Sequence, residues 1–184
     1  MKNILRILCS TIMVVVIFMP TMTSAKSGAV LELEVDETIT AFKEEVSGGE
    51  VFLTQAAGVL IFPSVVKVGL GIGAETGEGA LRIRGKTTDY YRTTSGSIGF
   101  QIGAQAKSVI IAFMTKEALD KFRNSEGWKV GIDGSVAIVD IGAGKTIDSQ
   151  NIKDPVVGFI FGSKGLMANL TFEGSKFSKL NKEK

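Results

Sequence analysis

The chain has 184 residues, with 21 Lys and Arg against 19 Asp and Glu, 22 Gly, 3 Pro, 1 Cys and no His. This length fits one domain, or at most two small ones. The absence of histidine excludes Ser-His-Asp and Cys-His catalytic systems, imidazole zinc ligands and imidazole pH switches, so we do not expect a conventional hydrolase. A composition of 45% hydrophobic and 22% charged residues is typical of a globular protein.

The first 25 residues have the pattern of a secretory signal peptide. Lys2 and Arg6 precede an apolar run over 7–19, and Pro20 ends that run before Thr23-Ser24-Ala25. The run is shorter than the roughly 20 residues of a membrane-spanning helix, and its small closing residues suit a signal peptidase. We therefore expect cleavage after residue 25 and export to the periplasm or the medium. An uncleaved membrane anchor is the alternative.

Removal of this segment changes the chemistry of the chain. Cys9 lies inside the apolar run, and Leu8 stands where a lipoprotein signal needs a small residue, so we do not expect lipidation. Residues 26–184 contain no cysteine, which excludes disulfides and thiol catalysis. Two basic residues and no acidic ones are lost, which leaves 19 of each sign. A formally neutral chain gives no reason to expect nucleic-acid binding.

Two helices are predicted at the start of the mature chain. The first spans 33–47 and ends at Gly48-Gly49, and the second covers about 50–57. The polar face of the first helix is acidic, whereas helices that lie on membranes favour basic residues. We therefore expect this helix to pack on the protein's own core rather than on a membrane. Its apolar residues recur every three or four positions: Val35, Ile39, Phe42 and Val46.

Glycine-rich strands come next in the chain. An apolar run over 58–62 reads as a buried strand stopped by Pro63, and alternating patterns over 66–75 and 98–105 put glycine or amide residues on one strand face. That face indicates helix packing or strong bending of the sheet, with a ligand groove as the alternative. Two shorter strands are joined through Gly85-Lys86, and a central strand comes last. These three strands cover 80–84, 89–94 and 107–114.

The remaining elements complete one domain. Thr115 is a good N-cap for a helix that ends within residues 124–127. Three more strands are predicted, the last two as a hairpin, with a polar connection over 142–154. No repeat or linker divides 26–184, so we predict a single α+β domain with its core over 33–180. Its curved, partly barrel-like, glycine-rich antiparallel sheet carries N-terminal helices and one mid-chain helix. The three strands cover 135–141, 156–161 and 166–172.

The sequence contains partial motifs for cofactor and metal binding, but the residues around them do not have the required pattern. Gly73, Gly77 and Gly79 have the loose spacing of a dinucleotide-binding turn, but a strand pattern comes after them where a helix is required. The carboxylates lack the spacing of a calcium loop and cannot be paired as an acid and a base. We therefore expect no cofactor, no metal and no enzymatic activity. The carboxylates considered are Glu75, Glu78, Asp133, Asp140, Asp148 and Asp154.

Basic and aromatic residues gather between 82 and 92. Arg82 and Arg84 are two apart on a predicted strand and should share a face, and Arg92 lies on the next strand. Arginine binds phosphate bidentately, and tyrosines favour the interfacial zone of a membrane. A grip on an anionic lipid headgroup is the functional interpretation, and a solvated charged face is the alternative. The candidate lipid-binding residues are Arg82, Arg84, Lys86, Tyr90, Tyr91 and Arg92.

Seven motifs follow one another along the chain: GVLIFPS (58–64), GEG (77–79), YY (90–91), SGSIGFQIGAQ (95–105), FMT (113–115), GW (127–128) and GLMA (165–168). This ordered set resembles the SYLF domain family over about 33–180. The resemblance implies a lipid-binding domain: eukaryotic members bind phosphoinositides and, in the yeast actin-patch proteins, actin, whereas bacterial members are exported or lipid-anchored. The acidic helix over 33–47 departs from the basic N-terminal segment of the eukaryotic members.

These observations predict a non-enzymatic module that binds anionic phospholipid or a membrane surface at the cell envelope. The alternative is an envelope structural or protein-interaction module, with actin as a partner if the protein reaches a host cell. Co-sedimentation with anionic vesicles at graded salt separates the two, because only a lipid-binding module should bind them and weaken with salt.

Overall fold

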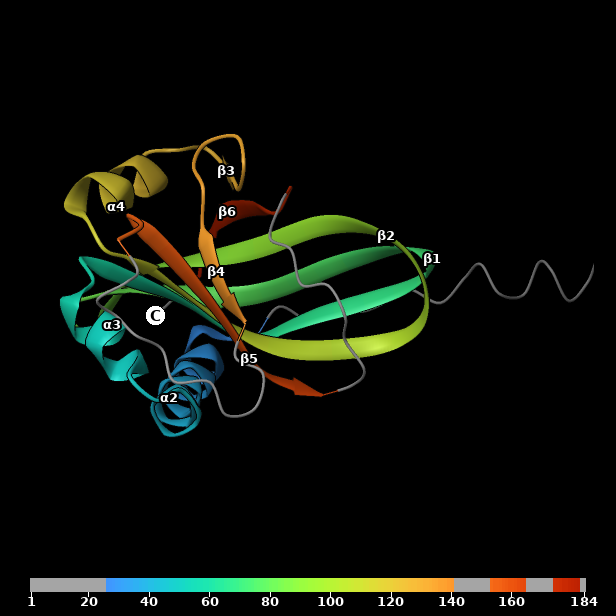
Figure 1. Cartoon of the computed structure of the whole chain (residues 1–184), viewed down its shortest axis with the longest axis horizontal. Helices are drawn as coiled ribbons and strands as arrows, with labels where there is room; N and C mark the ends of the chain where they lie inside the picture. The colour runs from blue at the N-terminus through green and yellow to red at the C-terminus, as the bar shows by residue number, and fades with distance from the viewer. Residues whose placement is uncertain (1–25, 141–152, 165–173, 183–184) are drawn as a thin grey trace, which may run out of the picture.

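The computed structural model describes residues 26–140, 153–164 and 174–182 (Figure 1). The predicted signal peptide over 1–25 lies outside these ranges, as do the predicted strand over 166–172, its hairpin and most of the polar connection. Within the described ranges, no helix has the length and apolar character needed to cross a membrane.

The two N-terminal helices are confirmed. Helix α2 covers Gly28–Glu45 and α3 covers Gly49–Gln55, and Gly48 separates them in a left-handed conformation (φ 84°). Helix α2 begins earlier than predicted because the Ser27 side chain caps it, accepting a hydrogen bond from the amide of Val30. Its apolar stripe packs on the sheet, as its spacing predicted.

Two long strands replace the separate strands expected between residues 58 and 114. Strand β1 covers Gly58–Ile83 and β2 covers Lys86–Phe113, and they pair antiparallel along their whole length. The predicted turn is confirmed at Gly85, but its other residue is Arg84, and Lys86 is the first residue of β2. In Figure 1 the pair runs out from the helices, bends and returns. Each long strand therefore contributes two differently directed halves to the sheet.

The prediction that Pro63 ends the first strand is wrong. Strand β1 passes through this residue, and the register with β2 shifts between Phe62 and Val65. Proline has no amide to donate to a strand ladder and is tolerated at such a bulge. The Pro63 carbonyl accepts a 2.9 Å hydrogen bond from the Ser108 hydroxyl.

Four shorter strands and one helix complete the described part of the fold. The strand order is β3-β6-β2-β5-β4, with β1 also paired to β2. Strands β4 and β5 are parallel, so the sheet is mostly antiparallel rather than wholly so. The half of β2 that includes Ile110 lies between β1 and β5, which confirms the predicted central strand. The elements are α4 (Lys116–Arg123), β3 (Trp128–Lys129), β4 (Ala137–Asp140), β5 (Val156–Lys164) and β6 (Lys176–Leu180).

The sheet curls because the two halves of β1 approach each other closely. A Cβ added at Gly79 would lie 2.3 Å from the carbonyl oxygen of Ile61, and one added at Gly77 would lie 2.7 Å from that of Ser64. Only glycine allows such an approach of backbone to backbone. At these two positions, glycine therefore allows the sheet to bend; neither position belongs to the glycine faces predicted over 66–75 and 98–105.

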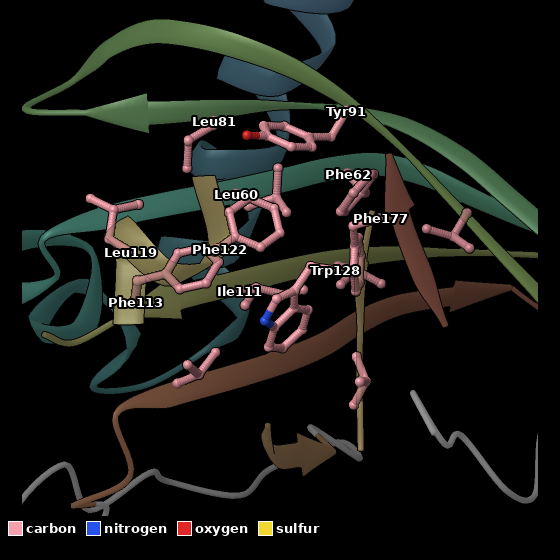
Figure 2. Close-up of a cluster of buried hydrophobic side chains, with 14 of the residues drawn as sticks. Leu60, Phe62, Leu81, Tyr91, Ile111, Phe113, Leu119, Phe122, Trp128 and Phe177 are labelled. Atoms are coloured by element: carbon pink, nitrogen blue, oxygen red, sulfur yellow. The ribbon is translucent and has the colours of Figure 1, made fainter. Parts of the chain in front are cut away.

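The core lies on both faces of this curled sheet. On one face, α4 places Phe122 against Leu60, Trp128 and Phe177 (Figure 2). On the other face, α2 and α3 cover β1, β2 and β5, where Phe42 contacts the ring of Phe159. The molecule is a single α+β domain with a curved sheet, N-terminal helices and a mid-chain helix. The predicted fold class is confirmed.

Candidate functional site

The candidate residues lie on the turn between β1 and β2 and on the strands beside it. Arg84 and Gly85 form the turn, and both have positive φ angles, 52° and 76°. Two such residues give a two-residue hairpin turn whose twist matches the flanking strands. Strand alternation ends with β1 at Ile83, so Arg84 belongs to the turn and does not continue the strand face that carries Arg82.

Arg84 in the turn and Lys86 at the start of β2 are exposed cations. No carboxylate of the described residues lies within 4.0 Å of either cation. Their charge is therefore exposed to solvent at the tip of the hairpin.

Arg82 instead faces helix α2. Its Nη1 donates to Asp36 at 2.5 Å and its Nη2 donates to Glu32 at 2.9 Å. The same Glu32 carboxylate accepts hydrogen bonds from the Thr87 hydroxyl at 2.9 Å and the Tyr90 hydroxyl at 2.8 Å. The Arg82 side chain is only 14% exposed, so α2 covers the guanidinium group.

These contacts fix the protonation states around Glu32. Burial opposes ionisation of this carboxyl, but hydrogen bonds from Arg82, Tyr90 and Thr87 outweigh it and hold the pKa of Glu32 below its ordinary value. Burial and the bond to Glu32 raise the pKa of Tyr90 to about 12. At neutral pH the phenol is therefore a hydrogen-bond donor and the carboxylate is its charged acceptor.

Tyr91 lies inside the core. The residue is 3% exposed, and its ring centroid is 4.8 Å from that of Phe122 (Figure 2). Its hydroxyl has no hydrogen-bond partner among the described residues. Burial and the nearby Asp89 carboxylate raise the pKa of Tyr91 to about 12. The aromatic ring of Tyr91 is therefore not presented at the surface in this conformation, although the sequence grouped it with the candidate binding residues.

Arg92 lies farther along β2 and has its own partner. Its Nη2 donates to Glu78 at 2.7 Å, its side chain is 43% exposed, and Lys182 lies 2.9 Å from the other oxygen of that carboxylate. Arg82 pairs with Thr87 in the ladder, five residues before Arg92. This is roughly 16 Å of strand. The guanidinium groups of Arg82 and Arg92 therefore bind different carboxylates and do not converge on one point.

A buried ion cluster inside the sheet was not predicted. The Lys107 side chain is 2% exposed and lies 2.9 Å from Glu75, whose other oxygen is 3.7 Å from Lys67. The sequence offered only a weak signal for it: a single charge at the start of an otherwise apolar strand segment. Ion pairs that are this buried require good geometry to offset desolvation.

A shallow hollow of about 400 Å³ opens where β2 meets β6. Asp89 lies within it and contacts Lys179 at 2.6 Å and Arg123 at 3.4 Å. Burial opposes ionisation of Asp89, but these cations hold its pKa below the ordinary value. Among the described residues, no group of three or more acidic, His or Cys side chains has the geometry of a metal site. The hollow is lined by Thr88, Asp89, Tyr90, Lys179, Leu180, Asn181 and Lys182.

Comparison with known families places the second half of the sequence. Residues 94–184 match the model of Ysc84, described as a Las17-binding protein actin regulator. Residues 94–184 therefore belong to the Ysc84 (SYLF) family. This confirms the SYLF resemblance over 94–184, whereas the motifs before Thr94 lie outside the match. No curated protein matches the chain.

The Ysc84 match begins after the candidate residues, which lie between 82 and 92. It starts at Thr94, two residues after Arg92, so it includes β2 from Thr94 on, α4 and the later strands. The description names binding and actin regulation and no catalytic activity. Lys86 and Arg92 lie before the matched segment on the same strand, β2, whereas Arg82 lies on β1 and Arg84 in the turn.

Proposed function

We propose that this protein is a non-enzymatic module that binds anionic lipid headgroups. The observation that carries the proposal is the turn at Arg84 and Lys86. It presents two exposed cations on a tight hairpin, and no described carboxylate lies within 4.0 Å of either one. Neighbouring Arg82 and Arg92 have carboxylate partners, so the turn is the part of the candidate site that is open to an outside anion.

The physical basis is attraction between these cations and a negatively charged surface. A Lys or Arg close to an anionic membrane contributes about 1 kcal/mol, and the effect falls off within a Debye length. Arg92 has a 43% exposed side chain and adds a weaker, shared charge farther along β2. The protein would therefore associate peripherally and reversibly, with an affinity that decreases as salt increases.

The setting that we propose is the cell envelope. The pattern of residues 1–25 supports export, cleavage after Ala25, and a mature domain over 26–184. An exported protein would meet phosphatidylglycerol and cardiolipin, and both carry the phosphate groups that arginine and lysine bind.

The test is co-sedimentation of the mature chain with phosphatidylcholine vesicles of graded phosphatidylglycerol content. The variant R84E/K86E should lose at least about 2 kcal/mol, which is about 30-fold in affinity. The matched control is K121E/K153E, which makes the same charge change at two other exposed lysines. Equal binding by R84E/K86E and this control would refute the assignment of the site to the turn.

A second candidate is a protein-interaction module that binds actin, which is favoured by the description of the Ysc84 family. This candidate predicts co-sedimentation with actin filaments, no dependence on vesicles, and no special effect of R84E/K86E. The same variants therefore separate the two functions when both assays are run in parallel.

A further inference from the structure

The hairpin holds one carboxylate with three convergent donors. Nη2 of Arg82 and the Thr87 hydroxyl both donate to Oε2 of Glu32 at 2.9 Å, and the Tyr90 hydroxyl donates to Oε1 at 2.8 Å. The second arm of the guanidinium binds Asp36 at 2.5 Å. A guanidinium and two hydroxyls directed at one pair of oxygens are the donor set of an anion-binding site.

The occupants of this site come from helix α2, and their side chains extend from a fixed backbone. Leu31 and Val35 are fully buried and anchor the helix on the sheet. The carboxylate side chains remain partly open to solvent, 30% exposed for Glu32 and 65% for Asp36. A change of side-chain rotamer can therefore carry either carboxylate away from Arg82 without moving the anchored helix.

We propose that Arg82, Thr87 and Tyr90 form a second binding site for a phosphate group, and that Glu32 and Asp36 are its internal, displaceable occupants. The membrane role of this site rests on the proposed function, whereas the anion site itself does not. The ligand chemistry is a phosphate, from either a lipid headgroup or free inorganic phosphate. The conformation in which both carboxylates contact Arg82 is then the closed form of the site.

Because Glu32 and Asp36 belong to the same chain as Arg82, the closed form discriminates between free phosphate and a surface that carries many phosphates. A side chain attached to the same molecule competes at an effective concentration in the millimolar range or above, so dilute free phosphate does not displace it. Two carboxylates also face one guanidinium, which leaves a local excess of negative charge beside Arg82. Only a dense array of phosphates, such as an anionic membrane held by Arg84 and Lys86, offers enough competing anions to open the site.

The alternative is that Glu32 and Asp36 only fasten α2 to the hairpin. The two explanations predict different results when the carboxylates are removed. A structural fastening predicts lower stability and no new ligand. An occupied anion site predicts a gain of phosphate binding, because the three donors remain on the sheet.

The first experiment uses E32A/D36A, with alanine chosen because it preserves the helix. The matched control is E37A/E44A, which removes two exposed carboxylates of the same helix that have no cation within 4.0 Å among the described residues. Inorganic phosphate is titrated into each protein while the Nε–H signal of Arg82 is followed by NMR. We expect a saturable shift in E32A/D36A at phosphate concentrations at least about tenfold below any shift in wild type or control.

A folded E32A/D36A variant whose Arg82 signal does not respond to phosphate would overturn the proposal. If E32A/D36A does not fold, E32Q/D36N is titrated in the same way, because it removes both charges and keeps the size of the side chains, and absence of an Arg82 shift has the same meaning. Adding R82Q to the responding variant must abolish the response, as judged from the Tyr90 ring signals.

The second experiment compares the same variants on phosphatidylglycerol vesicles. E32A/D36A should bind about tenfold more tightly than E37A/E44A, although both lose the same charge. Equal vesicle binding by the two variants would overturn the proposal that membranes open this site. If wild type ignores vesicles while phosphate shifts Arg82 in E32A/D36A, the proposed lipid function fails and the anion site stands. If wild type binds vesicles and phosphate leaves Arg82 unmoved, the anion site fails alone.

Discussion

Gly79 lies against Ile61, which belongs to the other half of the same strand: an added Cβ would be 2.3 Å from the Ile61 carbonyl oxygen. This contact shows how a strand of 26 residues returns over itself to form a curled sheet. A backbone carbonyl cannot move aside as the end of a flexible side chain can. The contact therefore makes the curvature sensitive to a single methyl group.

We predict that Gly79→Ala lowers the free energy of unfolding by about 1–3 kcal/mol because it overpacks this contact. The matched control is Gly96→Ala, since an added Cβ there meets nothing within 4 Å. The control should change stability by no more than about 0.5 kcal/mol. Urea unfolding measures both, and equal stability of the two variants would show that the sheet does not close in this way.

The two neighbouring tyrosines should respond in opposite ways to loss of their hydroxyl. Tyr91→Phe removes a buried hydroxyl without a described partner, so stability should stay the same or rise by up to about 1 kcal/mol. Tyr90→Phe removes the bond to Glu32 and should cost about 1–2 kcal/mol. Thermal melts of both variants test the difference. A larger loss for Tyr91→Phe than for Tyr90→Phe would contradict it.

Acid should destabilise the protein through carboxyls that are bonded in the folded state. The pKa values of Glu32 and Glu78 lie below their ordinary value of 4.5, and that of Asp89 lies below 3.8, because hydrogen bonds and nearby cations outweigh the opposing effect of burial. A lowered folded-state pKa gives stability that is present above the ordinary value and is lost as pH falls through the folded value.

We therefore expect the free energy of unfolding to fall as pH drops below about 4.5, with a shallower fall in Glu32→Ala. Urea titrations at a series of pH values measure the two slopes. Glu37→Ala is the control, because it removes an exposed carboxylate from the same helix. Identical slopes in Glu32→Ala and wild type would show that Glu32 is not held as described.

Processing of the precursor is a separate prediction. The short apolar run and Thr23-Ser24-Ala25 predict a mature protein that begins at Lys26. Intact-mass spectrometry of periplasmic and secreted fractions measures this directly. Recovery of the protein from membranes with Met1 still attached would contradict cleavage and support the anchor.

The sequence by itself determined the elements whose signals are local. The spacing of Val35, Ile39 and Phe42 identified the first helix, and the Thr115 side chain caps α4 as its position predicted. The turn at Gly85 could be located because a tight hairpin needs residues that tolerate positive φ. Such preferences act over one or two turns of the chain, so a single sequence reveals them.

The tertiary structure alone decided which distant groups meet. Arg82 binds Glu32 across 50 residues, so a strand position that suggested an open cation is in fact covered by an acidic helix. Strand β1 continues through Pro63 because the register shift at this point leaves no ladder hydrogen bond that would require a proline amide. Residues 176–180 form strand β6 because they pair with β2. Local propensity fixes which face a side chain takes, but strand pairing and ion pairing depend on long-range closure of the chain, which no local pattern encodes.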